Sequence, residues 1–334
     1  MRSFSALPPR SSGDHKSLPE AGSFAGPLPS IDLSLLRAMP WFKLTHEKHW
    51  IYVCLCAKPF CISIAIVDLG YMIKAFVFVY NQTKNAIEIS TSNMATPFRA
   101  HVNKGSTGKR KAWFHSGGLD ISIEQDAEHP HYRLHVKGTD ISISATLDQN
   151  KAPSPISAIG IPKPGHYHAT EKTALLNITG TMVLRKTSYS LSEGFAGIDY
   201  TCGYLPRVMD WHWAFGQGHT HQGQRIAFNL VKGALGDDEC ALWLDNELIP
   251  ISSGSFVFSD PHSSKPYQIR SNDGIIDVQF IPGGFHIERK NFLFLASSYI
   301  QAAGIFHGKI SLPNRKEIQL DSVLGVTEDQ HVLW

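Results

Sequence analysis

The chain has 334 residues, of which 43% are hydrophobic, and its 31 basic and 29 acidic side chains give a formal net charge of +2. This length allows two domains or one large one, and the apolar share is ordinary for a globular protein with a buried core. The near balance of charge gives no electrostatic reason to expect nucleic acid or an anionic membrane as a partner.

No targeting or membrane-spanning segment is expected. Arg2 is soon followed by Pro, Ser and Gly rather than by the apolar stretch of a secretory leader. The longest apolar run, residues 51–67, is interrupted by Lys58 and Pro59, so it is too short to cross a bilayer. The five cysteines include no CxxC pair and are expected to be buried thiols in a reducing compartment. These features predict a cytoplasmic protein without stable membrane insertion.

The first residues predict a tail and the following ones predict strands. Residues 1–28 are rich in Ser, Pro and Gly and cannot bury enough surface to offset their ordering entropy, so we expect a disordered tail. From Trp41 onward, short runs rich in Ile, Val, Phe and Tyr predict strands. The run 141–147 alternates apolar and polar residues, which is typical of a sheet with one face in water. The strands expected in the first half are 50–55, 60–69, 71–80, 86–91, 119–124, 132–137 and 141–147.

A proline-rich stretch, residues 151–165, is the best candidate for a boundary between two halves, 29–165 and 166–334. Helical patterns are short and few, at 31–37 and 170–175. Many short strands with regular turns predict an all-β fold of two packed, antiparallel, barrel-like halves. The strands expected in the second half are 175–184, 197–200, 210–215, 225–231, 241–244, 256–258, 267–269, 276–281, 292–297, 300–306 and 322–326.

The segment 197–218 holds the densest group of candidate ligand-binding side chains. If residues 210–215 form a strand, Trp211, Trp213 and Phe215 lie on one face of it. Such an aromatic wall suits an extended apolar ligand, or a cation that develops on one. The alternative is that these rings only fill the core. The candidates for an aromatic-lined pocket are Trp211, Trp213, Phe215, Tyr200 and Trp243.

Two groups of polar residues are candidates for proton transfer. On the other face of the same strand, Asp210 could orient the imidazole of His212, although a pair that faces solvent is the simpler alternative. Asp245 shares a face with Trp243, and a carboxylic acid buried beside aromatic rings has a raised pKa and could protonate a C=C bond. Alternatively, Asp245 and Asn246 form the turn of a hairpin.

Metal and cofactor chemistry have weaker support. His219 and His221, with His212 nearby, have the His-x-His spacing of a metal site, and His166 and His168 repeat that spacing. With 17 histidines in the chain such pairs arise by chance, so no metal is predicted. The sequence has no P-loop, HExxH, GxSxG or dinucleotide fingerprint, so no cofactor is predicted either.

Several short motifs occur in a fixed order along almost the whole chain after the tail. In this order they resemble the family called domain of unknown function 2804. The motifs are Lys48–Tyr52, Gly197–Thr201, Gly203–Arg207, Trp211–Ala214, Asn229-Leu230 in a run that closes at Gly233, Glu239 before Trp243 and Asp245, and Gln301 with Gly304, Phe306 and Gly308.

That family is similar, more remotely, to the AttH-like and carotenoid 1,2-hydratase group. The resemblance implies two lipocalin-like β-barrel halves with a pocket between or within them, an architecture shared by fungal cyclases of Diels–Alderase type. The hydratases carry a His-x-Trp pair and, further on, an aromatic-x-Asp pair. The second pair could match Trp243 and Asp245. The first falls on Trp211 and Trp213, so Trp211 stands where the hydratases have His, and the fold transfers better than the function.

Two functional hypotheses follow. The first is a binding protein for an apolar small molecule, such as a lipid, an acyl chain or an isoprenoid, which needs only the aromatic pocket. The alternative is a cofactor-independent hydratase, isomerase or cyclase acting on an apolar, polyene-like substrate. In that case Asp245 is the general acid, and Trp211 and Trp213 stabilise a cationic transition state. The oligomeric state stays open.

Overall fold

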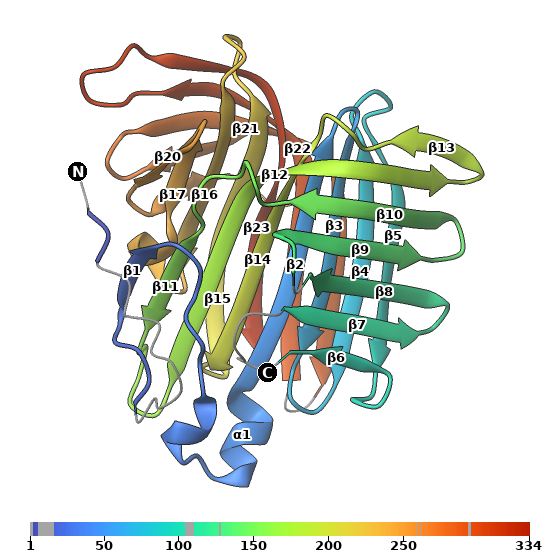
Figure 1. Ribbon diagram of the computed structural model, residues 1–334, viewed down its shortest axis with the longest axis vertical. Helices are drawn as coiled ribbons and strands as arrows, with labels where there is room; N and C mark the ends of the chain where they lie inside the picture. Colours follow the sequence, from blue (N-terminus) through green and yellow to red (C-terminus); the bar gives the residue numbers. More distant parts are fainter. Residues whose placement is uncertain are drawn as a thin grey trace.

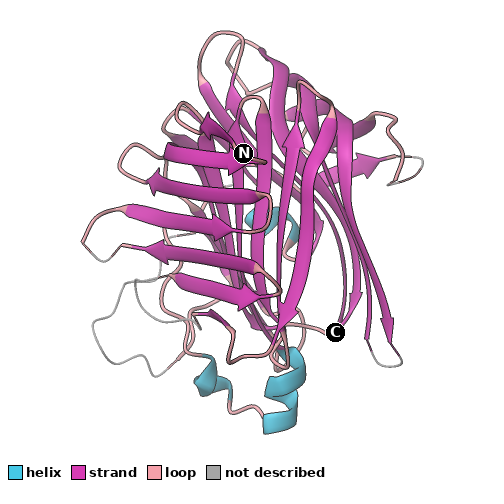
Figure 2. Ribbon diagram, turned by 90° about the vertical axis from the view of Figure 1, so that its right-hand side faces the viewer, coloured by secondary structure: helices cyan, strands magenta, loops and turns pink. Residues whose placement is uncertain are grey.

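The computed structural model describes residues 3–5, 17–103, 110–126, 128–258, 260, 262–292 and 295–334. Within these residues the strands form two antiparallel sheets, of 14 and 9 strands, and the predicted all-β fold is confirmed (Figures 1 and 2). The helical elements are η1 (Leu33–Leu36), α1 (Pro40–His46) and η2 (Gly236–Glu239). None of the helices in the described part of the chain is long and apolar enough to cross a membrane.

The first sheet curls into a barrel. Its main strand order is β5-β4-β3-β2-β14-β12-β10-β9-β8-β7-β6, while β1 pairs with β11, and β11 and β13 pair with β12. Figure 1 shows the short strands β6 to β10 lying in front of β3 to β5, which closes the barrel around its own core. The strands are β1 (Gly22–Ala25), β2 (Glu47–Ala57), β3 (Phe60–Asp68), β4 (Ile73–Asn81), β5 (Ala86–Ala95), β6 (Ala100–Val102), β7 (Lys111–Ser116), β8 (Leu119–Gln125), β9 (His131–Lys137), β10 (Ile141–Asp148), β11 (Ile156–Gly160), β12 (Tyr167–Leu184), β13 (Thr187–Ser190) and β14 (Phe195–Tyr204).

The second sheet forms a half-barrel that packs on the outside of the first. Its strand order is β18-β17-β16-β15-β23-β22-β21-β20-β19, and a second core lies between the two sheets. The strands are β15 (Val208–His219), β16 (Arg225–Gly233), β17 (Ala241–Leu244), β18 (Glu247–Pro250), β19 (Gly254–Val257), β20 (Tyr267–Ser271), β21 (Ile276–Phe292), β22 (Leu295–Ile310) and β23 (Ile318–Leu333).

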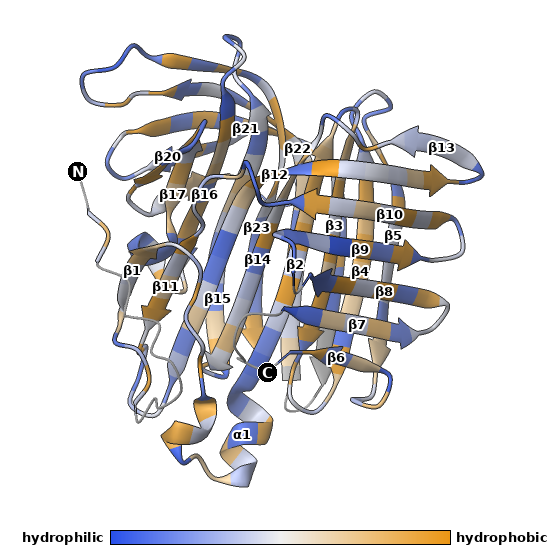
Figure 3. Cartoon of the chain, viewed as in Figure 1, coloured by the Kyte–Doolittle hydropathy of each residue, from blue (hydrophilic) through white to orange (hydrophobic). Residues whose placement is uncertain are grey.

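Strands β2 to β4 are buried on both faces, and this explains their continuous apolar sequence. Val53 points into the core of the first barrel, whereas its neighbours Tyr52 and Cys54 belong to the core between the sheets. A strand covered on both faces has no reason to alternate apolar and polar residues. In contrast, β10 alternates buried and exposed residues as predicted, and Figure 3 shows hydrophobic and hydrophilic bands along the neighbouring β8 and β9.

The division predicted after residue 165 falls inside the first sheet, between β11 and β12. The chain passes from one sheet to the other only at residues 205–207, between β14 and β15. The prolines of residues 151–165 flank β11 instead of ending a domain, because β11 pairs with both β1 and β12. Composition marks a surface connection, but it does not show which strands pair across it.

Part of the predicted tail is ordered. Residues 22–25 form β1, which pairs with residues 156–159, and the side chain of Phe24 is buried. Residues 1–2 and 6–16 of that prediction lie outside the described residues. Of the two weak helix predictions, residues 31–37 contain η1, whereas residues 170–175 lie within β12.

Candidate functional site

A cavity of about 200 Å³ lies between the two sheets. Strands β2, β3 and β4 of the first sheet line one side of it, and β15, β22 and β23 of the second sheet line the other. Most of its surface is aromatic or aliphatic. Its aromatic lining includes Trp50, Tyr52, Phe76, Trp211, Trp213 and Tyr299.

The alternation of β15 turns Trp211 and Trp213 toward this cavity. The ring of Trp213 meets Tyr52 edge to face at a centroid distance of 5.3 Å, and its Nε1 donates a hydrogen bond of 2.6 Å to Asn229. Phe215 lies behind Trp213, stacked on it at 5.9 Å, and is not part of the lining. It packs against Gly197 of β14, where a Cβ atom would come within 2.3 Å of the phenyl ring. Trp213 is therefore held in a fixed orientation.

A buried carboxyl group faces the cavity from β23. Oε1 of Glu328 accepts hydrogen bonds of 2.7 Å from the Tyr299 hydroxyl and 2.7 Å from Gln301 Nε2, and Oε2 accepts one of 3.2 Å from Trp211 Nε1. Burial raises the pKa of Glu328 despite these hydrogen bonds. More of this group is therefore protonated near neutral pH than in an exposed glutamate.

The sequence analysis did not single out Glu328, because the predicted strand ended at residue 326, whereas β23 continues to Leu333. The polar residues 327–331 resemble a surface segment. In the structure, Glu328 lies opposite Trp213 of β15 and Gln301 of β22. Glu328 would have been identified only if the predicted strand had been extended through residues 327–331. The periodicity of these polar residues gives little support for such an extension.

A second polar group lies on β12 and β14. Nζ of Lys172 lies 2.5 Å from Asp199 and 3.4 Å from Glu239. Burial opposes the charge of Lys172, but the two carboxylates outweigh it, so its pKa is raised. His168 is only 3% exposed, and burial together with Lys172 lowers its pKa to about 3. Its imidazole is therefore neutral at ordinary pH.

His168 lines the cavity and also contains a buried polar atom without a hydrogen-bond partner in the described part of the chain. Its side chain belongs to the lining, and its Nε2 has no hydrogen-bond partner within the described residues. A buried polar atom without a partner costs about 1–3 kcal/mol.

A third polar group lies where β4 meets β21. Nζ of Lys74 lies 2.6 Å from Glu288 and 5.2 Å from the ring centroid of Tyr299. Burial of Glu288 is outweighed by hydrogen bonds from His286 and the charge of Lys74, so its pKa is lowered. Glu288 is thus paired with a cation, whereas Glu328 is held by neutral donors.

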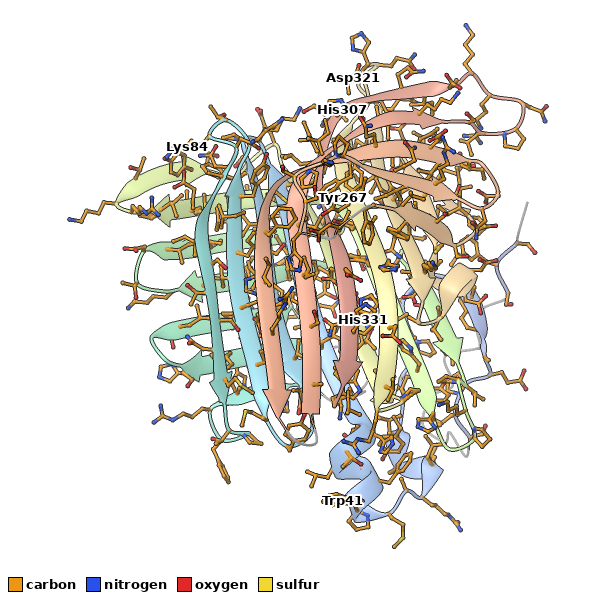
Figure 4. All side chains as sticks on the ribbon, turned by 180° about the vertical axis from the view of Figure 1, so that it is seen from behind. Trp41, Lys84, Tyr267, His307, Asp321 and His331 are labelled. Atoms are coloured by element: carbon orange, nitrogen blue, oxygen red, sulfur yellow. The ribbon has the colours of Figure 1, made fainter. Side chains whose placement is uncertain are left out.

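The predicted pair Asp210 and His212 is not brought together. Asp210 is exposed, and its Oδ1 lies 2.5 Å from Nδ1 of His331 (labelled in Figure 4). His212 lies 3.1 Å from Asp329, and its ring contacts the ring of Phe256 at 5.6 Å. Neither residue lines the cavity. Their catalytic role stays a prediction.

Asp245, Trp243 and Tyr200 also lie outside the cavity lining. Asp245 has a φ of 53° in the turn between β17 and β18 and accepts a hydrogen bond of 3.0 Å from the backbone of Arg225. Trp243 is fully buried and donates to the carbonyl of Ser154 at 2.9 Å. Tyr200 belongs to the core of the first barrel. Their predicted roles have no support from the position of the cavity.

The histidine spacings do not gather metal ligands. Among the described residues, the only group of three such side chains is Cys54, Cys56 and Cys61, whose Sγ atoms lie within 4.8 Å of one another. Cys56 and Cys61 donate to backbone carbonyls of the second sheet at 3.6 and 3.7 Å, so these thiols are packed between the two sheets. His221 is exposed beside Asp321 at 3.5 Å, and the His219 ring lies 5.0 Å from that of Phe195.

Comparison with known proteins supports the architecture. The model of a family described as domain of unknown function (DUF2804) matches residues 13–334. No curated protein matches the sequence. Three similar solved structures share 10–13% identity with this chain, which shows the fold alone. They are CghA crystallised with Sch210972 (TM-score 0.54, 10% identity, covering 86% of this chain and 88% of that chain), a putative AttH from Nitrosomonas europaea (0.54, 13%, 85% and 92%) and kievitone hydratase from Nectria haematococca (0.53, 10%, 91% and 94%).

Proposed function

This chain belongs to the DUF2804 family, and from its cavity we propose that it binds an apolar small molecule that carries a polar group. The observation that carries the proposal is the aromatic cavity between the sheets, whose lining also holds a few polar side chains such as His168 and Glu328. Ligand sites are typically concave and apolar, with a few well-placed polar groups that fix orientation. A lipid, an acyl chain or an isoprenoid with a hydroxyl, carbonyl or carboxyl end has this chemistry.

Two of the similar structures concern proteins that handle small molecules. CghA was crystallised with Sch210972, and kievitone hydratase is named for its hydration activity. These properties belong to those proteins. They support the proposal for this chain only through the shared fold, which places a space between two curled sheets.

The first test is to identify what the protein carries. Native mass spectrometry of protein purified from its own host, followed by denaturing extraction, should reveal a stoichiometric apolar molecule. Trp213→Ala should lower affinity for that molecule roughly tenfold or more, because it removes a large aromatic contact. Trp113→Ala is the control, since Trp113 is half-buried on β7 and outside the cavity lining. Equal loss in both variants, or an empty protein that binds no lipid or polyene, would contradict the proposal.

A second candidate function, acid catalysis on a C=C bond, is favoured by one further observation. Glu328 is a buried carboxyl group with a raised pKa in the cavity wall, and three neutral side chains hold it in place. Its proton would add to one carbon of the double bond, and the rings of Trp211 and Tyr299 would stabilise the cation on the other carbon. Water addition and return of a proton to Glu328 complete a hydration, whereas loss of a neighbouring proton completes an isomerisation.

Two substitutions separate this candidate from simple binding. Glu328→Gln should lower turnover by at least about a hundredfold, the usual contribution of a general acid, and leave ligand binding nearly unchanged. The matched variant is Asp245→Asn, since Asp245 was the acid predicted from sequence and lies outside the cavity. Full turnover by Glu328→Gln together with loss in Asp245→Asn would reverse the assignment. If a polyene binds but neither the wild type nor the variants convert it, acid catalysis is contradicted and the binding function stands.

A further inference from the structure

Most of the exposed large apolar side chains lie at one end of the molecule. Trp41 is 73% exposed, Met39 is 74% exposed and Phe98 is 93% exposed. Leu35, Leu44 and Ile161 are also exposed. Figure 4 shows Trp41 at the lower end, pointing away from the sheets. We call this end the apolar tip and define it as three segments: residues 33–46, 96–99 and 161–166.

Two of these segments touch each other. The ring of His166 lies 5.5 Å from that of Phe42 and 5.3 Å from that of His46, both on α1. In Figure 1, α1 projects from the same end of the sheets at which β2 begins. Residues 33–46 and 161–166 therefore form one surface.

The third segment is brought to the same end by strand pairing. Lys48 donates from Nζ to the carbonyls of Thr45 at 2.8 Å and Leu69 at 2.9 Å, which ties the end of α1 to the turn between β3 and β4. Just after that turn, Ile73 lies opposite Ala95, the last residue of β5. Residues 96–99 begin there.

The apolar tip has an excess of positive charge, although Asp32 and Glu47 adjoin its first segment. Within its three segments the charged side chains are Arg37, Lys43, Arg99 and Lys163, and there is no Asp or Glu. The balanced charge of the whole chain conceals this local excess. Exposed Trp and Phe beside Lys and Arg is the chemistry of a surface that lies in the headgroup region of an anionic bilayer.

The cavity reaches the same end of the sheets as the tip. Leu69, Tyr71, Met94, Met209 and Trp334 line the cavity, and each lies at or next to a strand end on this side of the sheets. Met94 is itself 38% exposed. The cavity therefore extends to the end of the sheets from which the tip projects.

We propose that the apolar tip docks on a membrane surface that contains anionic lipid, with Trp41 and Phe98 among the headgroups. The docked orientation places the tip end of the cavity against the bilayer, from which an apolar ligand is exchanged. Docking needs no ligand in the cavity, whereas the exchange rests on the proposed function.

Co-sedimentation of the full chain with vesicles tests the docking. The wild type should bind vesicles of phosphatidylcholine with phosphatidylserine, and Trp41→Glu should lower that affinity roughly tenfold or more. Val257→Glu is the matched control, because Val257 is 63% exposed on β19, outside the tip. Both sites are exposed, so neither substitution should shift the thermal midpoint.

The positive charge of the tip gives an independent test of the docking. Arg37→Gln and Lys43→Gln should each lower affinity for the anionic vesicles roughly fivefold, and leave binding to phosphatidylcholine alone unchanged. No sedimentation of the wild type with either vesicle overturns the proposal, as does equal loss in Trp41→Glu and Val257→Glu. Concentration-dependent dimerisation that Trp41→Glu abolishes, without vesicle binding, would overturn it too and assign the tip to a second copy of the chain. Trp213→Ala should still sediment, so a failed ligand site and a failed docking surface are distinguishable.

Discussion

At the scale of single residues, the four acidic groups in the lining of the cavity differ in their partners. Asp199 and Glu239 are paired with Lys172 and Glu288 with Lys74, whereas Glu328 is held by three neutral donors. The sequence analysis pointed to Asp245, which shares a strand face with Trp243, as a carboxyl group with a raised pKa. The turn of a hairpin takes Asp245 away from the cavity, and a strand across the sheet places Glu328 there instead.

His168 predicts a pH dependence of stability. Its pKa is lowered to about 3 in the folded protein and is about 6.5 in the unfolded chain, so below pH 6.5 the unfolded chain takes up a proton that the folded one does not. The contribution of the neutral His168 to the free energy of unfolding is fully present above pH 6.5. It is lost as the pH falls toward 3, by at most about 1.4 kcal/mol per pH unit. In urea unfolding, the free energy of unfolding of His168→Gln should rise progressively relative to that of the wild type as the pH falls below 6.5.

The control for this prediction is His135→Gln, because the His135 side chain is exposed on β9. Its pH profile should follow that of the wild type. Parallel profiles for His168→Gln and the wild type would show that His168 is not buried in its neutral form.

At the scale of elements, the apolar pattern predicted where many strands lie but underestimated the long ones. The predicted strand 210–215 is the middle of β15, which runs from Val208 to His219. The polar ends of β15 and β23 face water or the cavity, so they lack the apolar alternation that marks a half-buried strand. Their pairing with neighbouring strands decides their length.

The contact of β14 with β15 gives a prediction about packing. Gly197→Ala would place a Cβ atom 2.3 Å from the ring of Phe215, which cannot move without displacing Trp213. The free energy of unfolding should fall by about 1–3 kcal/mol, the usual cost of overpacking. Ligand affinity should fall as well, because Trp213 lines the cavity.

Gly218→Ala is the matched substitution on the β15 strand, where a Cβ atom would come no closer than 3.9 Å to Val323. It should leave the urea midpoint nearly unchanged. The double variant Gly197→Ala with Phe215→Leu should recover part of the lost stability. A similar loss for both alanine variants would mean that glycine at residue 197 serves the backbone rather than the ring.

At the scale of the whole molecule, two curled sheets share the apolar outer face of β2 to β4, and the cavity lies where this contact is incomplete. The same arrangement gathers three segments distant in sequence into the apolar tip. The formal net charge of +2 describes neither the paired acids of the cavity nor the cations of the tip. Both are local properties that arise when the sheets pack.

The sequence by itself determined the all-β class, the family and the aromatic face of Trp211 and Trp213, because alternation and turn residues are local and survive without knowledge of the partners. Only the tertiary structure decided the boundary between the sheets at residues 205–207, the position of Glu328 in the cavity and the isolation of His168. These depend on which strands pair and which faces meet. Such contacts join residues far apart in the chain, so no window of the sequence contains them.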